Sequence, residues 1–265
     1  MKVGIIGLGV VGSAVANGLR KIGNEVVSHD IKLNTKIEDL LDTLVIFICV
    51  PTPSNSDGSC NTDIVEEVLN DLNKLNYKGV VAIKSTVVPG TTEMFSQAYE
   101  PLNLCFVPEF LRERCAEIDF VENHDLCVIG AKDNNTFELI KKIHGNLPNN
   151  FVMLSRTEAE LVKYFNNVYN STLITFANSF YEICQELGAD YTNVKNAAVL
   201  RDHINDQYLD CNNNFRGFGG VCLPKDTKAL SYLSKNLEID NNFFQTLMDI
   251  NNKLKITVYE GMRDE

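Results

Sequence analysis

A cysteine in a glycine-rich segment is the strongest candidate for a reactive side chain. Cys222 lies within GFGGVCLPKD, residues 217–226, beside the charged pair Lys225 and Asp226. Glycines allow the backbone to approach a ligand closely, and a thiol becomes a strong nucleophile when a cation or a base adjoins it. The segment suggests covalent catalysis through Cys222, although a structural loop around a buried cysteine could have the same composition.

The other cysteines do not form a pattern typical of a metal or redox site. No C-x-x-C pair is present, so we expect neither zinc nor a redox dithiol. We expect most of these thiols to be small core residues of a protein in a reducing, cytoplasmic compartment. The seven are Cys49, Cys60, Cys105, Cys115, Cys127, Cys184 and Cys211.

A second candidate site is the motif G-x-G-x-x-G, formed by Gly7, Gly9 and Gly12. It follows an apolar run that reads as a strand and opens a segment with helical periodicity, which is the context that binds a dinucleotide diphosphate. Asp30 ends the next apolar run, where a carboxylate binds the ribose hydroxyls of NAD and repels the 2′-phosphate of NADP. Lys32 would weaken this preference, and glycines used only for packing would give the same motif.

The first part of the chain alternates apolar runs with amphipathic segments. This order predicts an α/β domain over residues 1–155, with a doubly wound parallel sheet of the Rossmann type. We expect strands at 3–8, 25–30, 44–50, 80–86, 102–108, 124–130 and 150–154, and helices at 10–22, 37–41, 63–75, after Gly90 and at 136–144.

The pattern becomes purely helical after residue 155. Thr157 and Glu160 have the spacing of a capping box, and apolar residues then recur at helical period as far as Gly188, which suits the end of a helix. Residues 156–265 are thus predicted to form an all-helical domain built on one long central helix. Further helices are expected at 193–200, 225–233 and 242–259.

Composition narrows the classes of partner. The 265 residues carry a net charge of −11, which disfavours nucleic acid and anionic membrane surfaces. The apolar run after Lys2 resembles a signal peptide superficially, but its glycines would weaken a signal helix, and no stretch is long and apolar enough to cross a bilayer.

Five segments, in addition to the glycine motif, resemble the nucleotide-sugar dehydrogenase family in the family's own order. The resemblance extends from Met1 to about Asn251 and implies an NAD-dependent enzyme that oxidises the C6 alcohol of a UDP-hexose, glucose first, to a carboxylate. The segments are CVPTP at 49–53, KSTVVPGTT at 84–92, VPEFLRE at 107–113, ELVKYFNN at 160–167 and ELGAD at 186–190.

The resemblance implies a role for each matching catalytic residue. Cys222 would attack the aldehyde from a first oxidation, and a second oxidation would leave a thioester that water hydrolyses. Lys163 and Asn167, four residues apart and so on one helix face, would stabilise negative charge on the reacting oxygen. Asp226 would act as a base or hold a water, and Glu109 would assist attack of water on the thioester. Taken alone, Lys163 and Glu109 could equally be solvated surface residues.

The resemblance also implies two sets of binding residues. Thr86, which also belongs to the catalytic set, and Glu113 would line the nicotinamide and an ordered water. The cofactor set is Gly7, Gly9, Val10, Val11, Gly12, Asp30, Val50, Thr52, Thr86, Glu113 and Lys225. The substrate set is Glu109, Phe110, Leu111, Arg112, Glu113, Lys163, Asn167, Tyr208 and Gly219.

The chain departs from the family pattern in three places. Only 39 residues follow Asp226 (265 − 226), too few for the second nucleotide-binding domain that family members usually carry, so we expect that domain to be absent. The segment between Arg201 and Phe218, in which Tyr208 lies, is longer than the family's loop, so the resemblance does not align Arg201 and Tyr208 position by position with substrate contacts of the family. Arg114 stands where many members have glycine.

Several alternatives remain open at this point. The substrate could be GDP-mannose or UDP-N-acetylmannosamine, and the chain could be a small hydroxyacid dehydrogenase that does not need Cys222. A cofactor-binding protein that has lost catalysis is the alternative from another class. The broad apolar surface of the predicted long helix, 157–187, favours burial on more than one side, so we expect a homodimer through the helical domain.

Overall fold

The computed structural model describes residues 1–254. Backbone contacts divide the chain into two compact units. Unit 1 comprises Met1–Pro53 and Cys60–Lys163, and unit 2 comprises Ser54–Ser59 and the chain from Tyr164 onward. The domain boundary expected at residues 155/156 stays a prediction, and the end of the predicted second domain, 255–265, lies outside the described residues.

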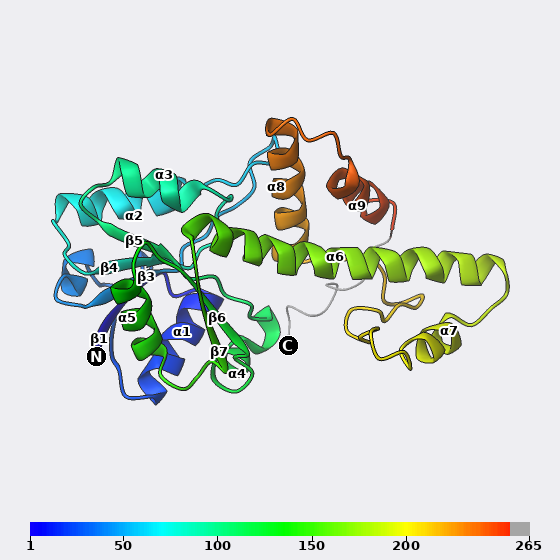
Figure 1. The fold of residues 1–265 in the computed structure, drawn as a ribbon, viewed down its shortest axis with the longest axis horizontal. Coiled ribbons are helices and arrows are strands. Elements are labelled where there is room, and N and C mark those ends of the chain that lie inside the picture. The colour runs from blue at the N-terminus through cyan, green and yellow to red at the C-terminus, as the bar shows by residue number, and fades with distance from the viewer. Residues whose placement is uncertain (255–265) are drawn as a thin grey trace. The chain divides into compact units, whose positions relative to one another are not determined.

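Unit 1 is built on a seven-stranded sheet with the order β2-β1-β3-β4-β5-β6-β7 (Figure 1). Strands β1 to β5 pair in parallel, β6 runs antiparallel to β5, and β7 is parallel to β6. The predicted α/β fold is confirmed, with the last two strands reversed. The strands are β1 (Lys2–Ile6), β2 (Glu25–His29), β3 (Val45–Ile48), β4 (Val80–Ile83), β5 (Asn103–Phe106), β6 (Leu126–Gly130) and β7 (Asn150–Leu154).

Helices cover both faces of this sheet, as a doubly wound fold requires (Figure 1). The central strands VIFI and VVAI are buried at every residue, which explains their unbroken apolar sequences. One face carries α1 (Val10–Lys21), α4 (Ala116–Val121) and α5 (Asn134–His144). The other carries η1 (Ile37–Leu40), α2 (Asp63–Lys74) and α3 (Thr91–Ala98).

The long helix α6 (Arg156–Glu186) begins with a different cap from the predicted one. The backbone N–H of Ser155 donates to Glu158 Oε2 at 2.8 Å, and the N–H of Glu158 donates to Ser155 Oγ at 3.3 Å. The capping box predicted for Thr157 and Glu160 is therefore wrong. The observed pair, Ser155 and Glu158, lies two positions before the predicted pair, and the helix begins at Arg156.

Glu160 instead caps another helix. Its side chain is fully buried, and its two carboxylate oxygens accept hydrogen bonds from the N–H groups of Gly90 and Thr92 at the amino end of α3, at 2.5 and 2.7 Å. Burial raises the pKa of Glu160, while these bonds act against the rise. The carboxylate thus fixes the start of α3, and with it the segment that leads from β4.

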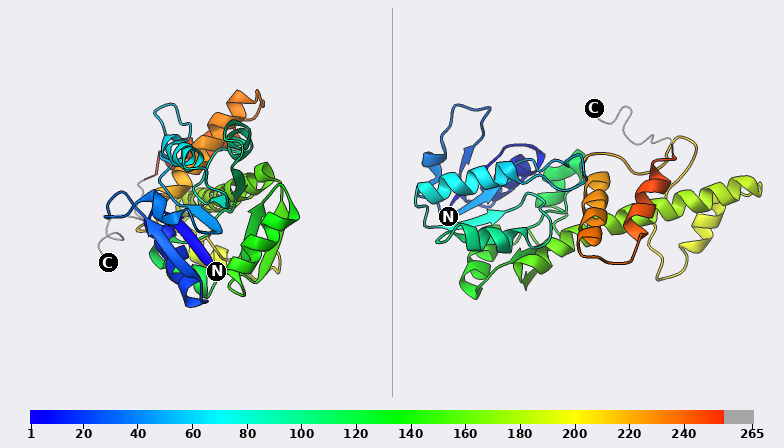
Figure 2. Two further views of the ribbon diagram at one scale, coloured as in Figure 1. Left: turned by 90° about the vertical axis from the view of Figure 1, so that its left-hand side faces the viewer. Right: turned by 90° about the horizontal axis from the view of Figure 1, so that it is seen from above.

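Unit 2 contains α6 from Tyr164 onward, α7 (Tyr191–Ala198), α8 (Cys222–Asn236) and α9 (Phe243–Asn251). Helix α8 begins three residues before the predicted start. Pro224 lies in its first turn, where backbone N–H groups have no acceptor within the helix, so a proline is tolerated there. Figure 2 shows α8 and α9 lying side by side. The predicted last helix ends earlier, at Asn251, and its final predicted residues, 255–259, lie outside the described part.

Two further features of unit 2 follow from its sequence. Gly188 adopts a positive φ of 67° just after α6, as a helix-ending glycine should. Tyr181 and Cys184 of α6 pack against Tyr191 of α7 in a small apolar core. Of the helices in residues 1–254, none combines the length and apolar character that a membrane span requires.

Candidate functional site

The glycine loop after β1 has the shape that a dinucleotide requires. Gly7 has a φ of +87°, and a Cβ on Gly12 would lie 1.9 Å from the carbonyl oxygen of Gly7. A side chain therefore cannot be placed at Gly12 without moving the turn. A Cβ on Gly9 would meet nothing within 4 Å, so open space lies where the diphosphate is expected. Val10 and Val11 begin α1 directly behind this loop.

Asp30 is joined to the same loop. Its Oδ2 accepts a hydrogen bond from the N–H of Leu8 at 2.7 Å, and its Oδ1 accepts one from the N–H of Lys32 at 2.9 Å. These bonds lower the pKa of Asp30, so the carboxylate is ionised at neutral pH. An ionised carboxylate at the end of β2 fits the ribose hydroxyls of NAD, and the first turn of α1 contains no acidic residue that would repel a phosphate.

Hydrogen bonds join the two segments that follow β3 and β4, at the carboxyl ends of these strands. The Thr52 hydroxyl donates to the carbonyl of Thr86 at 2.7 Å, and the Ser85 hydroxyl donates to the carbonyl of Val50 at 2.7 Å. Ligands of open α/β sheets bind at this edge. Val50, Thr52 and Thr86 are thus brought together, with Thr52 acting through its hydroxyl on the backbone.

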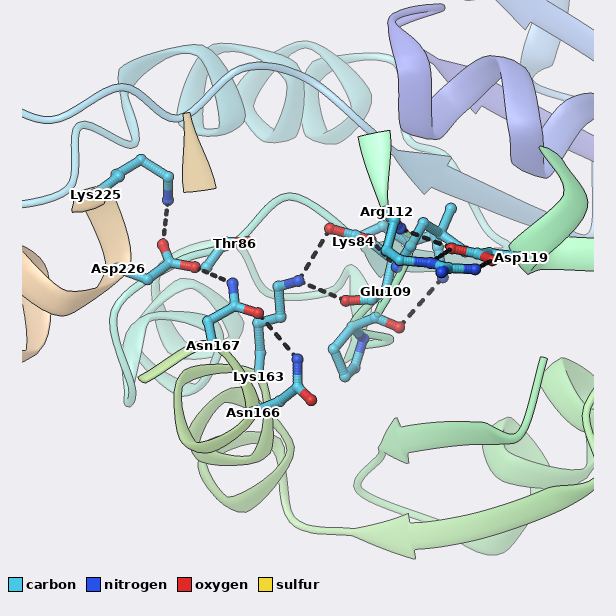
Figure 3. A network of polar contacts seen from close by, with 12 residues as sticks. Lys84, Thr86, Glu109, Arg112, Asp119, Lys163, Asn166, Asn167, Lys225 and Asp226 are labelled. Atoms are coloured by element: carbon cyan, nitrogen blue, oxygen red, sulfur yellow. Dashed lines mark hydrogen bonds and ion pairs between the residues drawn. The ribbon is translucent and has the colours of Figure 1, made fainter. Parts of the chain in front are cut away.

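Lys163 and Glu109 form a nearly buried pair within unit 1 (Figure 3). The Lys163 ammonium donates to the carbonyl oxygen of Glu109 at 2.7 Å and lies 3.1 Å from its Oε1. Glu109 Oε2 accepts a further bond from the N–H of Leu111 at 2.7 Å, and Lys163 lies 5.7 Å from the centre of the Phe110 ring. A cation and a carboxylate are therefore held against one loop, residues 107–113, in a site largely closed to solvent.

Lys84 also holds this loop, although no role was predicted for its side chain. Its side chain is buried, and its ammonium donates to the carbonyls of Val107 and Pro108 at 3.1 and 3.5 Å, directly before Glu109 (Figure 3). Its partners lie more than twenty positions away in the sequence, so no local pattern could reveal the contact. Lys84 fixes the backbone that carries Glu109.

The far end of the loop is anchored by Asp119 of α4, another residue that sequence reasoning missed. The backbone N–H and the Nε of Arg112 both donate to Asp119 Oδ2 at 2.9 Å, and Nη2 lies 2.6 Å from Oδ1. Asn123 donates to the same carboxylate at 3.2 Å. Arg112 was predicted to contact substrate, and its side chain is bound to Asp119 instead. Glu113 follows it in the 3-10 turn η2 (Glu113–Cys115).

Replacing Asp119 with asparagine should destabilise unit 1 by about 1–3 kcal/mol at neutral pH, because the charged hydrogen bonds to Arg112 are weakened. The effect is no larger because Arg112 is half exposed and solvent screens part of the ion pair. The Arg112 guanidinium lowers the pKa of Asp119 below its ordinary 3.8. The folded state is thus stabilised above pH 3.8, and this contribution is lost as pH falls through the lowered pKa. Urea unfolding, followed by circular dichroism, should show that the difference in the free energy of unfolding between variant and wild type becomes smaller below about pH 4.

Asp71→Asn is the matched control, because Asp71 forms an exposed pair with Lys74 at 3.4 Å. Asp71→Asn should change the free energy of unfolding by no more than about 0.5 kcal/mol. Equal stability of Asp119→Asn and wild type at pH 7 would contradict the anchoring role.

Within unit 2, Asp226 is the centre of a second polar group (Figure 3). Its side chain is 1% exposed, and its Oδ2 accepts a hydrogen bond from Asn167 Nδ2 at 2.5 Å, while Lys225 Nζ lies 2.6 Å from its Oδ1. Asn167 is also buried. The predicted residues Asn167, Lys225 and Asp226 are thus in direct contact, and Lys163 lies one helical turn before Asn167 in α6.

Cys222 is the exposed thiol among the eight cysteines, all of which lie in the described residues. It is the first residue of α8, where backbone N–H groups favour negative charge, and Asp226 follows four positions later on the same helix face. By contrast, burial raises the pKa of Cys49, Cys105 and Cys127 to about 12. These three thiols stay protonated at neutral pH, as expected for residues that pack in the core.

The glycine-rich approach to Cys222 is held by Asn251 of α9, a residue that sequence reasoning did not find. Gly217 and Gly220 have positive φ values of 65° and 77°. Between them, Phe218 is buried, and its N–H and carbonyl each form a 2.8 Å hydrogen bond with the Asn251 side chain. Gly219 remains half-buried in this turn.

Tyr208 lies in the same long connection, at a φ of +65° and 39% exposed. In residues 1–254 its hydroxyl forms no hydrogen bond to another residue. Its predicted contact with substrate stays a prediction.

Two family models match this chain. The NAD binding domain of the UDP-glucose/GDP-mannose dehydrogenase family matches residues 32–148, and the central domain of the same family matches residues 157–253. Together they span most of the sequence and both of its predicted domains.

Individual relatives agree with these models. The chain is 28% identical to a putative UDP-glucose 6-dehydrogenase, YtcA, of Bacillus subtilis (strain 168), over 95% of this chain and 67% of the relative. It is 29% identical to the GDP-mannose 6-dehydrogenase of Pseudomonas aeruginosa, over 95% of this chain and 68% of the relative. The chain thus spans about two thirds of the length of these relatives.

Solved structures show the same fold. The structure of a UDP-glucose dehydrogenase from Pyrobaculum islandicum matches with a TM-score of 0.87 at 28% identity, over 95% of this chain and 68% of that one. A UDP-D-ManNAc dehydrogenase from Pyrococcus horikoshii matches with a TM-score of 0.82 at 21% identity, over 96% and 68%. With NAD as its cofactor, the chain belongs to the UDP-glucose/GDP-mannose dehydrogenase family of nucleotide-sugar dehydrogenases.

Proposed function

We propose that this protein oxidises the C6 alcohol of UDP-glucose to the carboxylate of UDP-glucuronate. The observation that carries the proposal is the exposed Cys222 at the first residue of α8, one helical turn before the buried Asp226. A simple alcohol dehydrogenase has no use for a nucleophilic thiol, whereas a two-step oxidation to an acid does.

NAD, when bound, accepts a hydride in each of the two oxidations. The first converts the alcohol to an aldehyde and releases one proton. The Cys222 sulfur then adds to the aldehyde carbon, and the carbonyl oxygen takes a proton to give a thiohemiacetal. The second oxidation converts this adduct to a thioester with release of another proton, and water cleaves the C–S bond to give the acid and the regenerated thiol.

The charged side chains have complementary roles in this sequence. Lys163 and Asn167 would stabilise negative charge on the C6 oxygen, and both donate hydrogen bonds from nearly solvent-free positions where such bonds are strong. Asp226 would accept the proton or hold the attacking water, and Glu109 would orient water toward the thioester. The pairs Lys163–Glu109 and Asn167–Asp226 support these roles by fixing each donor and acceptor.

The remaining predicted residues would bind the two ligands. Gly7, Gly9, Val10, Val11 and Gly12 would hold the diphosphate of NAD, Asp30 its ribose, and Val50, Thr52, Thr86, Glu113 and Lys225 the rest of the cofactor. The backbone of residues 110–113, Gly219 and Tyr208 would hold the sugar nucleotide.

The test is turnover with a panel of UDP- and GDP-sugars, in which NADH formed and sugar nucleotide consumed are both measured. UDP-glucose should give the highest kcat/KM. A higher value with GDP-mannose or UDP-N-acetylmannosamine would contradict the substrate and leave the chemistry intact. Binding of NAD without turnover of any sugar nucleotide would instead favour a cofactor-binding protein without catalysis.

A homodimer is part of the proposal. Within unit 2, α6 exposes a row of large apolar side chains, among them Phe165 at 75%, Phe176 at 54% and Ile183 at 52%. Exposed apolar rows of this kind are typical of subunit interfaces. Light scattering coupled to size-exclusion chromatography should give twice the mass of one chain, and a monomer at micromolar concentration would contradict the proposal.

A further inference from the structure

A cavity within unit 1 lies over the amino end of α1. It has a volume of about 330 Å³ and is lined by Val10 and Ser13 of α1 and by the turn η2 with the start of α4. The GxGxxG loop leads directly into this end of α1, and Gly9 leaves its approach open. The cavity therefore adjoins the place where the negatively charged diphosphate of NAD must lie.

Arg114 is the one cation among the residues that line this cavity. Its guanidinium is exposed and forms no hydrogen bond or ion pair with any residue from 1 to 254. Of the two acidic residues in the lining, Glu117 is paired with Lys21 at 2.8 Å and also accepts a bond from Asn17. The charge of Arg114 is thus available for a ligand.

The turn that carries Arg114 is fixed on both sides. Arg112 is bound to Asp119 through its backbone and its guanidinium, and the N–H of Cys115 donates to the carbonyl of Arg112 at 3.0 Å. Asp119 belongs to α4, which packs closely on α1, since a Cβ on Gly18 would lie 2.3 Å from the Phe120 ring. The backbone of Arg114 is therefore held at a set position relative to the amino end of α1.

From this placement we infer that Arg114 binds the diphosphate of the dinucleotide and completes the site formed by the glycine loop. A planar guanidinium with several N–H donors matches two phosphate oxygens, and its charge supplements the N–H groups of the first turn of α1. A local cation is needed because the chain as a whole carries a net charge of −11, which disfavours an anionic ligand. A residue without a charged side chain at this position would provide none of these donors.

The test is the affinity for NADH, measured by the fluorescence emission of its nicotinamide. Arg114→Ala should weaken binding about tenfold, and Arg114→Lys less, because lysine keeps the charge and loses the two-pronged geometry. The dependence of affinity on salt should become less steep in Arg114→Ala. Displacement of NADH by ADP-ribose, which has the diphosphate and lacks the nicotinamide, should be weakened by the same factor.

Arg20→Ala is the matched control. Arg20 lies at the other end of α1, about 15 Å along the helix from Val10, and its loss changes the net charge equally. Its affinity for NADH should stay within about twofold of wild type. Three results would overturn the inference: an Arg114→Ala affinity within twofold of wild type, an equal loss in Arg20→Ala, or a loss for NADH without a loss for ADP-ribose. Because no sugar nucleotide is used, these results are independent of the proposed reaction.

Discussion

Cys222→Ser should lower formation of the sugar carboxylate by about a thousandfold, equivalent to about 4 kcal/mol of transition-state stabilisation. A serine hydroxyl stays protonated and is a far weaker nucleophile than a thiol at the amino end of α8. The aldehyde would then lack the covalent bond that prepares it for the second oxidation. The measurement is kcat for carboxylate formation, with NADH counted in the same reaction.

Cys211→Ser is the control for this substitution. Cys211 lies in the same unit, is buried, and donates through its sulfur to Asn178 Oδ1 at 3.4 Å, a contact that a serine hydroxyl can reproduce. Burial raises the pKa of Cys211 to about 11, so this thiol is not a nucleophile at neutral pH. Its activity should stay near wild type, and a Cys222→Ser enzyme with similar activity would remove the basis for covalent catalysis.

Lys163→Met should lower kcat/KM at least a hundredfold, because it removes a buried ammonium proposed to stabilise the oxyanion. It should also destabilise the protein by about 3 kcal/mol, since Glu109, at 10% side-chain exposure, loses the cation that compensates its charge. Thermal unfolding and steady-state kinetics measure the two effects separately.

The double variant Lys163→Met, Glu109→Gln separates catalysis from stability. Removing both charges should restore much of the folding free energy, because no uncompensated carboxylate remains. Its kcat/KM should stay well below that of Glu109→Gln alone, which lacks the same carboxylate and keeps Lys163. Recovery of activity together with stability would mean that Lys163 acts only as a structural partner of Glu109. A single Lys163→Met variant with kcat/KM within threefold of wild type would contradict its catalytic role outright.

The elements of the fold were largely predictable because periodicity reports burial. The fully apolar runs VIFI and VVAI became buried central strands, and the helical period after residue 155 became α6. The reversed direction of β6 and β7 was not predictable, because strand direction depends on how the connections cross the sheet. The prediction of the α6 cap failed for a similar reason: the Glu160 carboxylate accepts hydrogen bonds from Gly90 and Thr92, which are distant in sequence.

The candidate site was predictable where its residues form local motifs. The glycine loop, Asp30 and the segment around Cys222 each carry their signal within a few positions. The residues that hold the site in place do not. Lys84, Asp119 and Asn251 act on backbone or side chains that folding brings to them, so neither spacing nor residue type distinguishes them from ordinary core or surface positions.

The most direct test of the central claim is to quench the enzyme in acid during turnover with UDP-glucose and NAD, and to map the peptides by mass spectrometry. Covalent catalysis predicts that the peptide containing Cys222 carries the oxidised sugar nucleotide as a thioester, and that two NADH form for each UDP-glucose consumed. One NADH per UDP-glucose, with an aldehyde product and no adduct on Cys222, would contradict it.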